Sequence, residues 1–124
     1  MLRRIRVDYS GNKINLYVRN TGYISRFLGL MFKTRKTGNL LFEFKEDVNI
    51  SIHSLFVFFT FLIVWLDDEN RILGYRIVRP FCFSVLPKKP FRKFVEIPIS
   101  LHNKRLINFF VGKRKNLNIR YCII

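Results

Sequence analysis

The chain has 124 residues, enough for one hydrophobic core and too few for two, so we predict a single domain over residues 1–124. Hydrophobic residues make up 49% of the sequence and 14 residues are Phe, whereas Ala and Gln are absent, a composition that disfavours a helical bundle and favours strands. The formal net charge of +15 predicts attraction to nucleic acid or another polyanion, although the same charge also arises on a surface that Lys and Arg merely keep soluble.

A strand is predicted over residues 13–20, as the first strand of the fold, because apolar and polar side chains alternate there. Its aliphatic side chains share one face, and its charged and amide side chains share the other face with Tyr17. A short helix is predicted next, over residues 25–32, with Thr21 or Ser25 as its N-cap.

The middle of the chain predicts a half-exposed strand at residues 39–47 and a further strand at 48–54 that runs into an apolar stretch with a bend near Thr60. That uncharged stretch, 54–66, is shorter than the roughly 20 residues of a membrane-spanning helix, so we predict no transmembrane segment. Three acidic residues follow it, which indicates a hairpin whose first strand is buried on both faces and whose turn holds the acids. The side chains expected to be buried in its strands are Phe56, Phe58, Ile63 and Trp65.

The last third of the chain predicts one irregular segment, two strands and one helix. Three prolines make residues 79–90 an irregular edge segment, because proline cannot donate a hydrogen bond to a strand ladder. A strand follows at 93–99, then a short helix at 101–108 that Ser100 caps, and a last strand at 117–123. The predicted fold is mainly β (α+β), a small β-barrel or β-sandwich-like single domain with one or two short helices.

The two cysteines, Cys82 and Cys122, are far apart in the sequence and have no partner at the spacing of a zinc site. The first ten residues have the positive charges of a secretory leader, but no apolar segment follows those charges. We therefore expect a cytoplasmic protein with free thiols.

An ordered set of short motifs gives a resemblance to a known family. Residues 26–31 read Arg-x-x-Gly-Leu-Met, residues 41–44 read Leu-Phe-x-Phe, and a hydrophobic stretch at 53–59 precedes the acidic turn at 67–70. In this order they resemble the domain of unknown function 192 family of bacteria and archaea, over about residues 26–112, and the chain looks like a divergent, archaeal-like member. The resemblance implies a compact, mostly β domain with one or two short helices, and it brings no established activity.

The chain departs from this family's pattern at polar positions. Thr60 and Leu62 stand where the family usually has Pro and Asp, Ser100 stands at a usual Gly, and Lys113 follows Gly112 where the family has Gly-Asp. If those polar groups serve a site in the relatives, the resemblance implies that this copy has lost or changed the site.

The candidate ligand-binding residues are polar, aromatic or adaptable side chains set among apolar neighbours: Arg26, Met31, His53, Trp65 and Glu96. His53 and Glu96 could perform acid–base chemistry if the strands brought them together, but they could equally satisfy backbone groups. We assign no catalytic residue, no cofactor and no metal site. The three acids at 67–69 lack the ligand spacing of an EF-hand and are expected to form a solvated turn.

Basic runs recur at 3–6, 33–36, 88–93, 103–105 and 113–115, and Phe32, Phe91 and Phe94 lie in or beside two of them. Basic and aromatic side chains together can follow a phosphate backbone and stack on bases, whereas a charge run can also be only a solvated loop. The candidate nucleic-acid-binding residues are Lys33, Arg35, Lys36, Lys88, Lys89, Arg92 and Lys93.

The sequence thus predicts an uncharacterised small β-rich domain that is a non-enzymatic ligand- or partner-binding module. The alternative is a basic nucleic-acid-binding protein, and an enzyme that uses His53 and Glu96 is less favoured. The ligand, the partner and the oligomeric state do not follow from the sequence.

Overall fold

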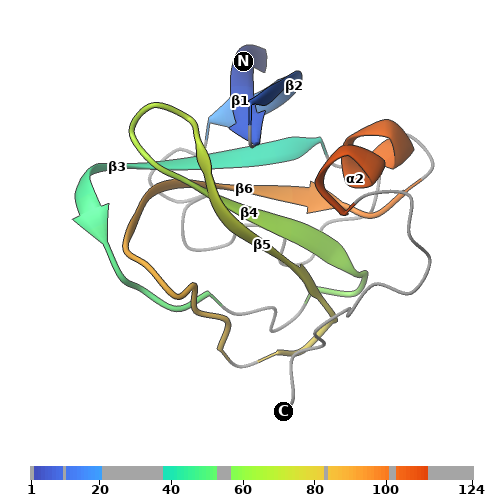
Figure 1. Cartoon of the computed structure of the whole chain (residues 1–124). Helices are drawn as coiled ribbons and strands as arrows, with labels where there is room; N and C mark the ends of the chain where they lie inside the picture. Colours follow the sequence, from blue (N-terminus) through green and yellow to red (C-terminus); the bar gives the residue numbers. More distant parts are fainter. Residues whose placement is uncertain are drawn as a thin grey trace.

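Six strands form one mixed sheet, in the order β1-β2-β3-β6-β4-β5 (Figure 1). The computed structural model describes residues 2–9, 11–20, 38–52, 57–82, 84–100 and 103–111. Its elements are β1 (Leu2–Tyr9), β2 (Asn12–Asn20), β3 (Asn39–Val48), β4 (Phe61–Leu66), β5 (Ile72–Val78), β6 (Phe91–Pro98) and the helix α2 (Lys104–Val111).

The strands pair antiparallel except at one junction. β1 and β2 form a hairpin along their whole length, and Gly11 in its turn has a φ of 86°, which glycine adopts without a steric penalty. β3, β6, β4 and β5 continue the sheet antiparallel. The single parallel junction joins β2 to β3, and its paired β2 residues are only Val18 to Asn20.

The sheet curls until its two edge strands meet at one end. The backbone N–H of Asp8 in β1 donates to the carbonyl of Asn70 at the start of β5, at 3.0 Å, and Asp8 forms an isolated parallel bridge with Arg71. The result is a half-barrel with one short helix among the described residues, and in Figure 1 α2 stands at the side of this curled sheet.

β4 is the centre of the core because all six of its residues are buried. Side chains alternate along a strand, so Leu62, Val64 and Leu66 enter the concave cluster while Phe61, Ile63 and Trp65 enter the convex one. The concave cluster also takes Val7, Leu16, Val18, Leu41, Val95, Ile97 and, from α2, Phe110. The convex cluster takes Leu40, Phe42, Val57, Phe59, Val78, Cys82, Val85, Phe91 and Phe94.

The mainly β fold predicted from the sequence is confirmed, together with most of its strands. The alternating strand at 13–20 is β2, the hairpin whose first strand is buried on both faces is β4 and β5, and the strand at 93–99 is the main part of β6. Residues 79–90 carry no strand in their described part. Among the described residues, the helix found is not long and apolar enough to cross a membrane.

Four local predictions are wrong. Residues 13–20 are the second strand, because β1 precedes them. Between Val48 and residue 52 the chain leaves the sheet and makes only an isolated bridge from Ile52 to Val85, so no strand spans 48–52. Phe58 lies outside any strand and is 59% exposed, because the chain has not yet entered β4.

The predicted cap of the C-terminal helix is the fourth error. The helix begins at Lys104, and the Ser100 Oγ is buried with no hydrogen-bond partner in the part of the chain that the structure describes. The Asn103 amide instead donates to the Pro98 carbonyl at 2.8 Å and ties the start of the helix to β6. The helix predicted at 25–32, the strand predicted at 117–123 and the side chain of Phe56 lie outside the described residues.

The free thiol predicted for Cys82 is also wrong, because Cys82 is disulfide-bonded and buried. The only other cysteine of the chain, Cys122, lies outside the described residues. Separation along the sequence does not limit which half-cystines meet in a fold, so the spacing argument failed. The cytoplasmic location stays a prediction.

Replacing Leu62 with Asp tests the concave core. Leu62 is fully buried in β4, so Leu62→Asp should lower the free energy of unfolding by at least about 3 kcal/mol at pH 7, because a carboxylate would be enclosed among aliphatic side chains. Leu86→Asp is the control, since Leu86 is exposed, and should change stability by about 0.5 kcal/mol or less. Urea unfolding measures both, and an unchanged Leu62→Asp midpoint would show a polar pocket beside β4.

Alkylation tests the state of Cys82. Protein denatured without reductant and treated with iodoacetamide should carry no label on Cys82, because a disulfide offers no thiolate to the reagent. The same treatment after reduction should label it. Peptide mass spectrometry reads both samples, and label on Cys82 in the unreduced sample would contradict the disulfide.

Candidate functional site

Two of the five predicted ligand-binding residues lie together on the convex face of the sheet. Trp65 of β4 and Glu96 of β6 are diagonal neighbours, because Trp65 pairs with Phe94 and Ile63 pairs with Glu96. They are only 2% and 4% exposed, and the Trp65 Nε1 has no hydrogen-bond partner in the described part of the chain. The other three, Arg26, Met31 and His53, lie outside the described residues, so this site stays a prediction.

The predicted basic loop is divided between a turn and a strand. Lys88 and Lys89 are exposed, whereas Arg92 and Lys93 belong to β6 and contact acids of β3. The Arg92 Nε lies 3.2 Å from a carboxylate oxygen of Asp47, and the Lys93 Nζ donates to the Asn70 side chain at 2.7 Å and lies 4.0 Å from Glu43. Lys33, Arg35 and Lys36 lie outside the described residues.

The aromatic side chains predicted beside that loop are not available to stack on bases. Phe91 is fully buried and Phe94 is 5% exposed, and their rings pack edge to face with centroids 5.8 Å apart. Both rings belong to the convex core cluster, where the pairing of β6 with β3 shifts register between Glu43 and Val48, so this part of the prediction is wrong.

The acidic turn between β4 and β5 is a structural turn, as predicted. Asp67 accepts hydrogen bonds from the backbone N–H groups of Glu69 and Arg71 and from the Arg71 guanidinium, at 2.8 to 2.9 Å. Partial burial would raise the pKa of Asp67, but these hydrogen bonds outweigh it and hold the pKa below its ordinary value. Within the described ranges, no three His, Cys, Asp or Glu residues gather in a way that could hold a metal ion.

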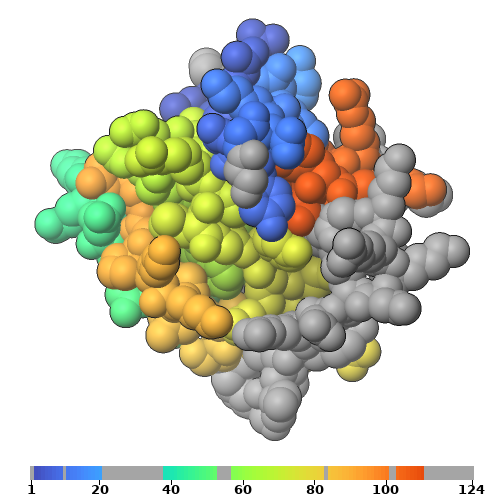
Figure 2. All heavy atoms as spheres, viewed as in Figure 1, coloured from blue at the N-terminus to red at the C-terminus, as the bar shows by residue number. Residues whose placement is uncertain are grey.

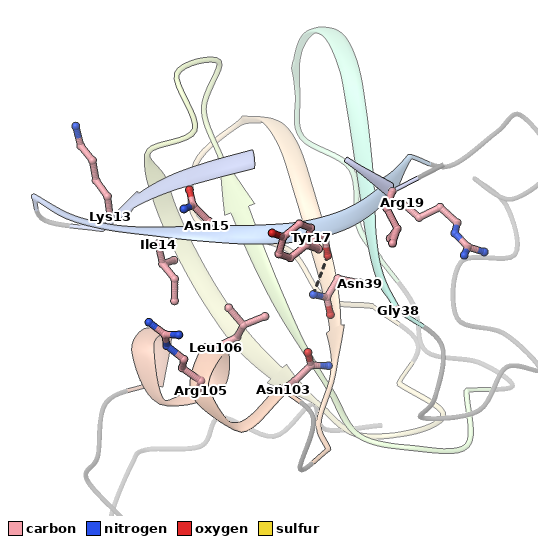
Figure 3. Close-up of a pocket in the computed structure, with 11 residues that line it drawn as sticks. Lys13, Ile14, Asn15, Tyr17, Arg19, Gly38, Asn39, Asn103, Arg105 and Leu106 are labelled. Carbon is pink, nitrogen blue, oxygen red and sulfur yellow. Dashed lines mark hydrogen bonds between the residues drawn. The ribbon is translucent and has the colours of Figure 1, made fainter. Parts of the chain in front are cut away.

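An open groove of about 810 Å³ lies between β2, the start of β3 and the first turn of α2 (Figure 3). Its lining combines amides, aliphatic and aromatic carbon, and basic side chains: Leu2, Lys13, Ile14, Asn15, Tyr17, Arg19, Gly38, Asn39, Asn103, Arg105 and Leu106. Ile14 points from β2 toward the helix and Leu106 points from α2 toward β2, so these two apolar side chains lie between the two walls of the groove. Trp65 and Glu96, the two predicted ligand-binding residues that the structure describes, do not line this groove.

The groove exists because β2 and β3 separate after a short junction. The residues of β2 that pair with β3 are Val18 to Asn20. At the next residue of β2, Tyr17, the carbonyl accepts a hydrogen bond from the Asn39 Nδ2 at 3.1 Å instead of from a strand backbone (dashed in Figure 3). Toward Asn12, β2 has β1 on one side and no paired strand among the described residues on the other. The Asn39 Oδ1 is enclosed near this junction, without a hydrogen-bond partner in the described ranges.

The opposite wall is held by the packing of α2. Phe110 is buried in the concave cluster, and Leu106 and Ile107 pack against it, so one side of the helix covers the open end of the half-barrel. Figure 2 shows α2, in orange-red, next to the β1–β2 hairpin, in blue. This packing leaves Arg105 exposed at the rim of the groove.

The charged side chains that the structure describes in the groove are all basic. Lys13, Arg19 and Arg105 belong to its lining, and no described lining residue is Asp or Glu. None of the three forms an ion pair with another described residue, and in Figure 3 the Lys13 side chain extends away from α2 while the Arg105 guanidinium lies below Ile14. A cationic groove with apolar carbon at its floor can hold an anionic group together with a short apolar segment.

Sequence reasoning missed this groove although part of its signal was present. The basic run at 103–105 marks the helix side, and the alternating strand at 13–20 marks the other wall. Nothing in the local sequence shows that β2 leaves β3 after the junction, or that the helix packs opposite the strand edge.

The half-barrel sheet, the single described helix and the basic groove define a small, mainly β domain. The chain is 32% identical over 90 residues to a UPF0127 protein of Pyrococcus furiosus, an alignment that covers 71% of this chain and 77% of that protein. The chain belongs to the UPF0127 family. It is also 30% identical over 81 residues to a UPF0127 protein of Thermococcus gammatolerans, of which it spans 52%, and the alignment covers 64% of this chain.

The family membership agrees with the predicted resemblance at a coarser level. What is established is membership of an uncharacterised family, whose relatives carry the name UPF0127 and not the name under which the motifs were recognised. No family model matches the chain. The names of these relatives state no ligand and no reaction.

Two crystal structures share the fold. A candidate transcription regulator from Sinorhizobium meliloti superposes with a TM-score of 0.70 at 18% identity, over 86% of each chain. A protein of unknown function from Novosphingobium aromaticivorans gives a TM-score of 0.69 at 14% identity, over 85% of this chain and 78% of that one. At such low identity the likeness concerns the fold alone.

Acid unfolding tests the Asp67 turn. The pKa of Asp67 is lowered in the folded protein, so its contribution to stability is present above the unfolded pKa of about 4 and is lost as the pH falls through the folded value. At pH 7, Asp67→Asn should cost about 1 kcal/mol, because it replaces charge-assisted hydrogen bonds with neutral ones. Toward pH 2 the free energies of unfolding of the variant and the wild type should become equal.

Asp68→Asn is the matched control, since Asp68 is exposed in the same turn. It should leave the free energy of unfolding within about 0.5 kcal/mol of the wild type at pH 7. Equal losses for Asp67→Asn and Asp68→Asn would mean that general charge, and not the hydrogen bonds of Asp67, stabilises the turn.

Proposed function

We propose that this chain is a non-enzymatic binding module that takes a negatively charged partner in the groove between β2 and α2. One observation carries the proposal: among the described residues, three basic side chains and no acidic one line a groove of about 810 Å³. Such a groove concentrates anions, and its charge selects them more than its shape does.

The chemistry of the lining favours binding over catalysis. The groove offers the amides of Asn15, Asn39 and Asn103 as hydrogen-bonding groups, and its described lining includes no His, Cys, Asp or Glu as an acid, base or nucleophile. The less favoured alternative, an enzyme that uses His53 and Glu96, places its chemistry on the convex face, where Glu96 is enclosed between Leu40 and Ile63.

Nucleic-acid binding is the second candidate, and the outer face of the β1–β2 hairpin favours it. Tyr17 is 62% exposed and pairs across the strands with Arg4, while Arg6 pairs with Asn15 and Arg19 with Leu2. An exposed aromatic ring among cations is the arrangement that stacks on a base while the charges contact phosphates. This surface replaces the buried rings of β6 as the place where such stacking is possible.

Charge reversal in α2 tests the proposed function. With inorganic tripolyphosphate and hexaglutamate as probes at 0.15 M salt, Arg105→Glu should weaken binding at least about tenfold, since a contact between charged groups is worth about 1.5 kcal/mol or more. Lys104→Glu is the matched control, because Lys104 is the neighbouring exposed residue of the same turn but does not line the groove. It should weaken binding by less than about threefold.

Amide chemical shifts of ¹⁵N-labelled protein show where the probes bind. Shifts confined to Asn15, Tyr17 and Leu106 support the groove. Equal weakening by Arg105→Glu and Lys104→Glu, or shifts spread over the whole basic surface, would overturn the proposal. If a mixed-sequence single-stranded DNA 12-mer instead binds more tightly than either probe and shifts Arg4 and Arg6, the second candidate takes its place.

A further inference from the structure

The wall of the groove formed by β2 is an open strand edge. The Tyr17 carbonyl points to the side of β3, since it accepts the hydrogen bond of Asn39 there. In an antiparallel hairpin the N–H and C=O of one residue point to the same side and successive residues alternate. Lys13 and Asn15 therefore direct their backbone groups to that side with Tyr17, and these three residues line the groove.

The backbone groups on this edge have no partner strand in the part of the chain that the structure describes. The pairing with β3 begins at Val18, and beyond it only the Tyr17 carbonyl is engaged, by the Asn39 side chain. Asn12, Lys13, Asn15 and Tyr17 are exposed along this strand. A row of free N–H and C=O groups is a template on which another strand can pair.

We propose that the groove binds an extended acidic peptide that adds a strand to the open edge of β2. This inference rests on the proposed function of the groove as an anion site and names the class of partner. The edge from Asn12 to Tyr17 spans about 20 Å at roughly 3.3 Å per residue, so a peptide of about six residues covers it.

The edge distinguishes a peptide from a phosphodiester chain. Its carbonyl groups at Lys13 and Asn15 need donors, and its N–H groups need acceptors. A peptide backbone supplies both in alternation, whereas a phosphate backbone only accepts. The strand edge therefore favours a peptide, and nucleic acid is an outcome of the test.

Charge and shape select an acidic sequence with alternating apolar residues. One face of an added strand would meet the outer face of β2, where Lys13 and Arg19 lie, and the other would meet Ile14 and Leu106. A second copy of this chain would instead bring like charges together on two molecules of net charge +15. The acidic peptide is therefore the occupant that the edge fits.

The probe is the peptide acetyl-Glu-Val-Glu-Val-Glu-Val-amide, compared with two backbone N-methylated forms. One form is methylated at its three Glu residues and the other at its three Val residues. Only one of these two sets can point its N–H groups at β2 in an added strand. One methylated peptide should bind at least tenfold more weakly than the parent, and the other should bind within about threefold of it.

Hydrogen exchange supplies the second readout. The backbone N–H groups of Lys13, Asn15 and Tyr17 should exchange fast in the free protein and at least tenfold more slowly with the parent peptide. Tripolyphosphate should occupy the groove and leave their exchange fast, since it forms no ladder.

The outcomes separate the two proposals. If tripolyphosphate and all three peptides bind with the Arg105 dependence described above but methylation changes nothing, the groove is an anion site and strand addition is wrong. If the parent peptide leaves the exchange of Lys13, Asn15 and Tyr17 fast, or if single-stranded DNA slows that exchange to the same extent, the groove binds polyanions by charge alone and strand addition is also wrong. If no probe binds in the groove, both proposals fail.

Discussion

Burial of β4 on both faces is the constraint from which the rest of the fold follows. Six consecutive apolar side chains alternate between two clusters, so neither face of the sheet can be left to water. The convex face is covered by residues around 57–59 and 78–85, and the concave face is covered by the curl of the sheet and by Phe110 of α2. Asp8 holds the curl through its backbone hydrogen bond to Asn70.

The groove is a consequence of that curl. To bring β1 toward the β4–β5 turn, the β1–β2 hairpin has to turn away from β3, so the parallel junction is short and most of one β2 edge is left unpaired. Asn39 closes the junction by donating to the Tyr17 carbonyl. The helix that covers the open end of the half-barrel then forms the opposite wall, so the same packing that completes the core also creates the groove.

The basic charge is distributed unevenly over the described surface. Arg3, Arg71, Arg92 and Lys93 lie within ion-pair distance of acidic side chains, and such exposed pairs contribute little to stability. Lys13, Arg19 and Arg105 at the groove lack such partners among the described residues. In the proposed function the charge acts through these three positions, whereas Arg92 and Lys93 of the basic run at 88–93 lie beside acids of β3.

The sequence by itself determined the fold class and the strands β2, β4, β5 and most of β6, because alternation of side chains and turn residues are local signals. Only the tertiary structure decided that Phe58 is exposed, that Phe91 and Phe94 are enclosed and that Cys82 is not a free thiol. It also decided where the groove lies, since the open edge of β2 depends on how far a distant strand pairs with it. Strand pairing joins residues far apart in the chain, and no short stretch of sequence records which partner a strand edge finds or lacks.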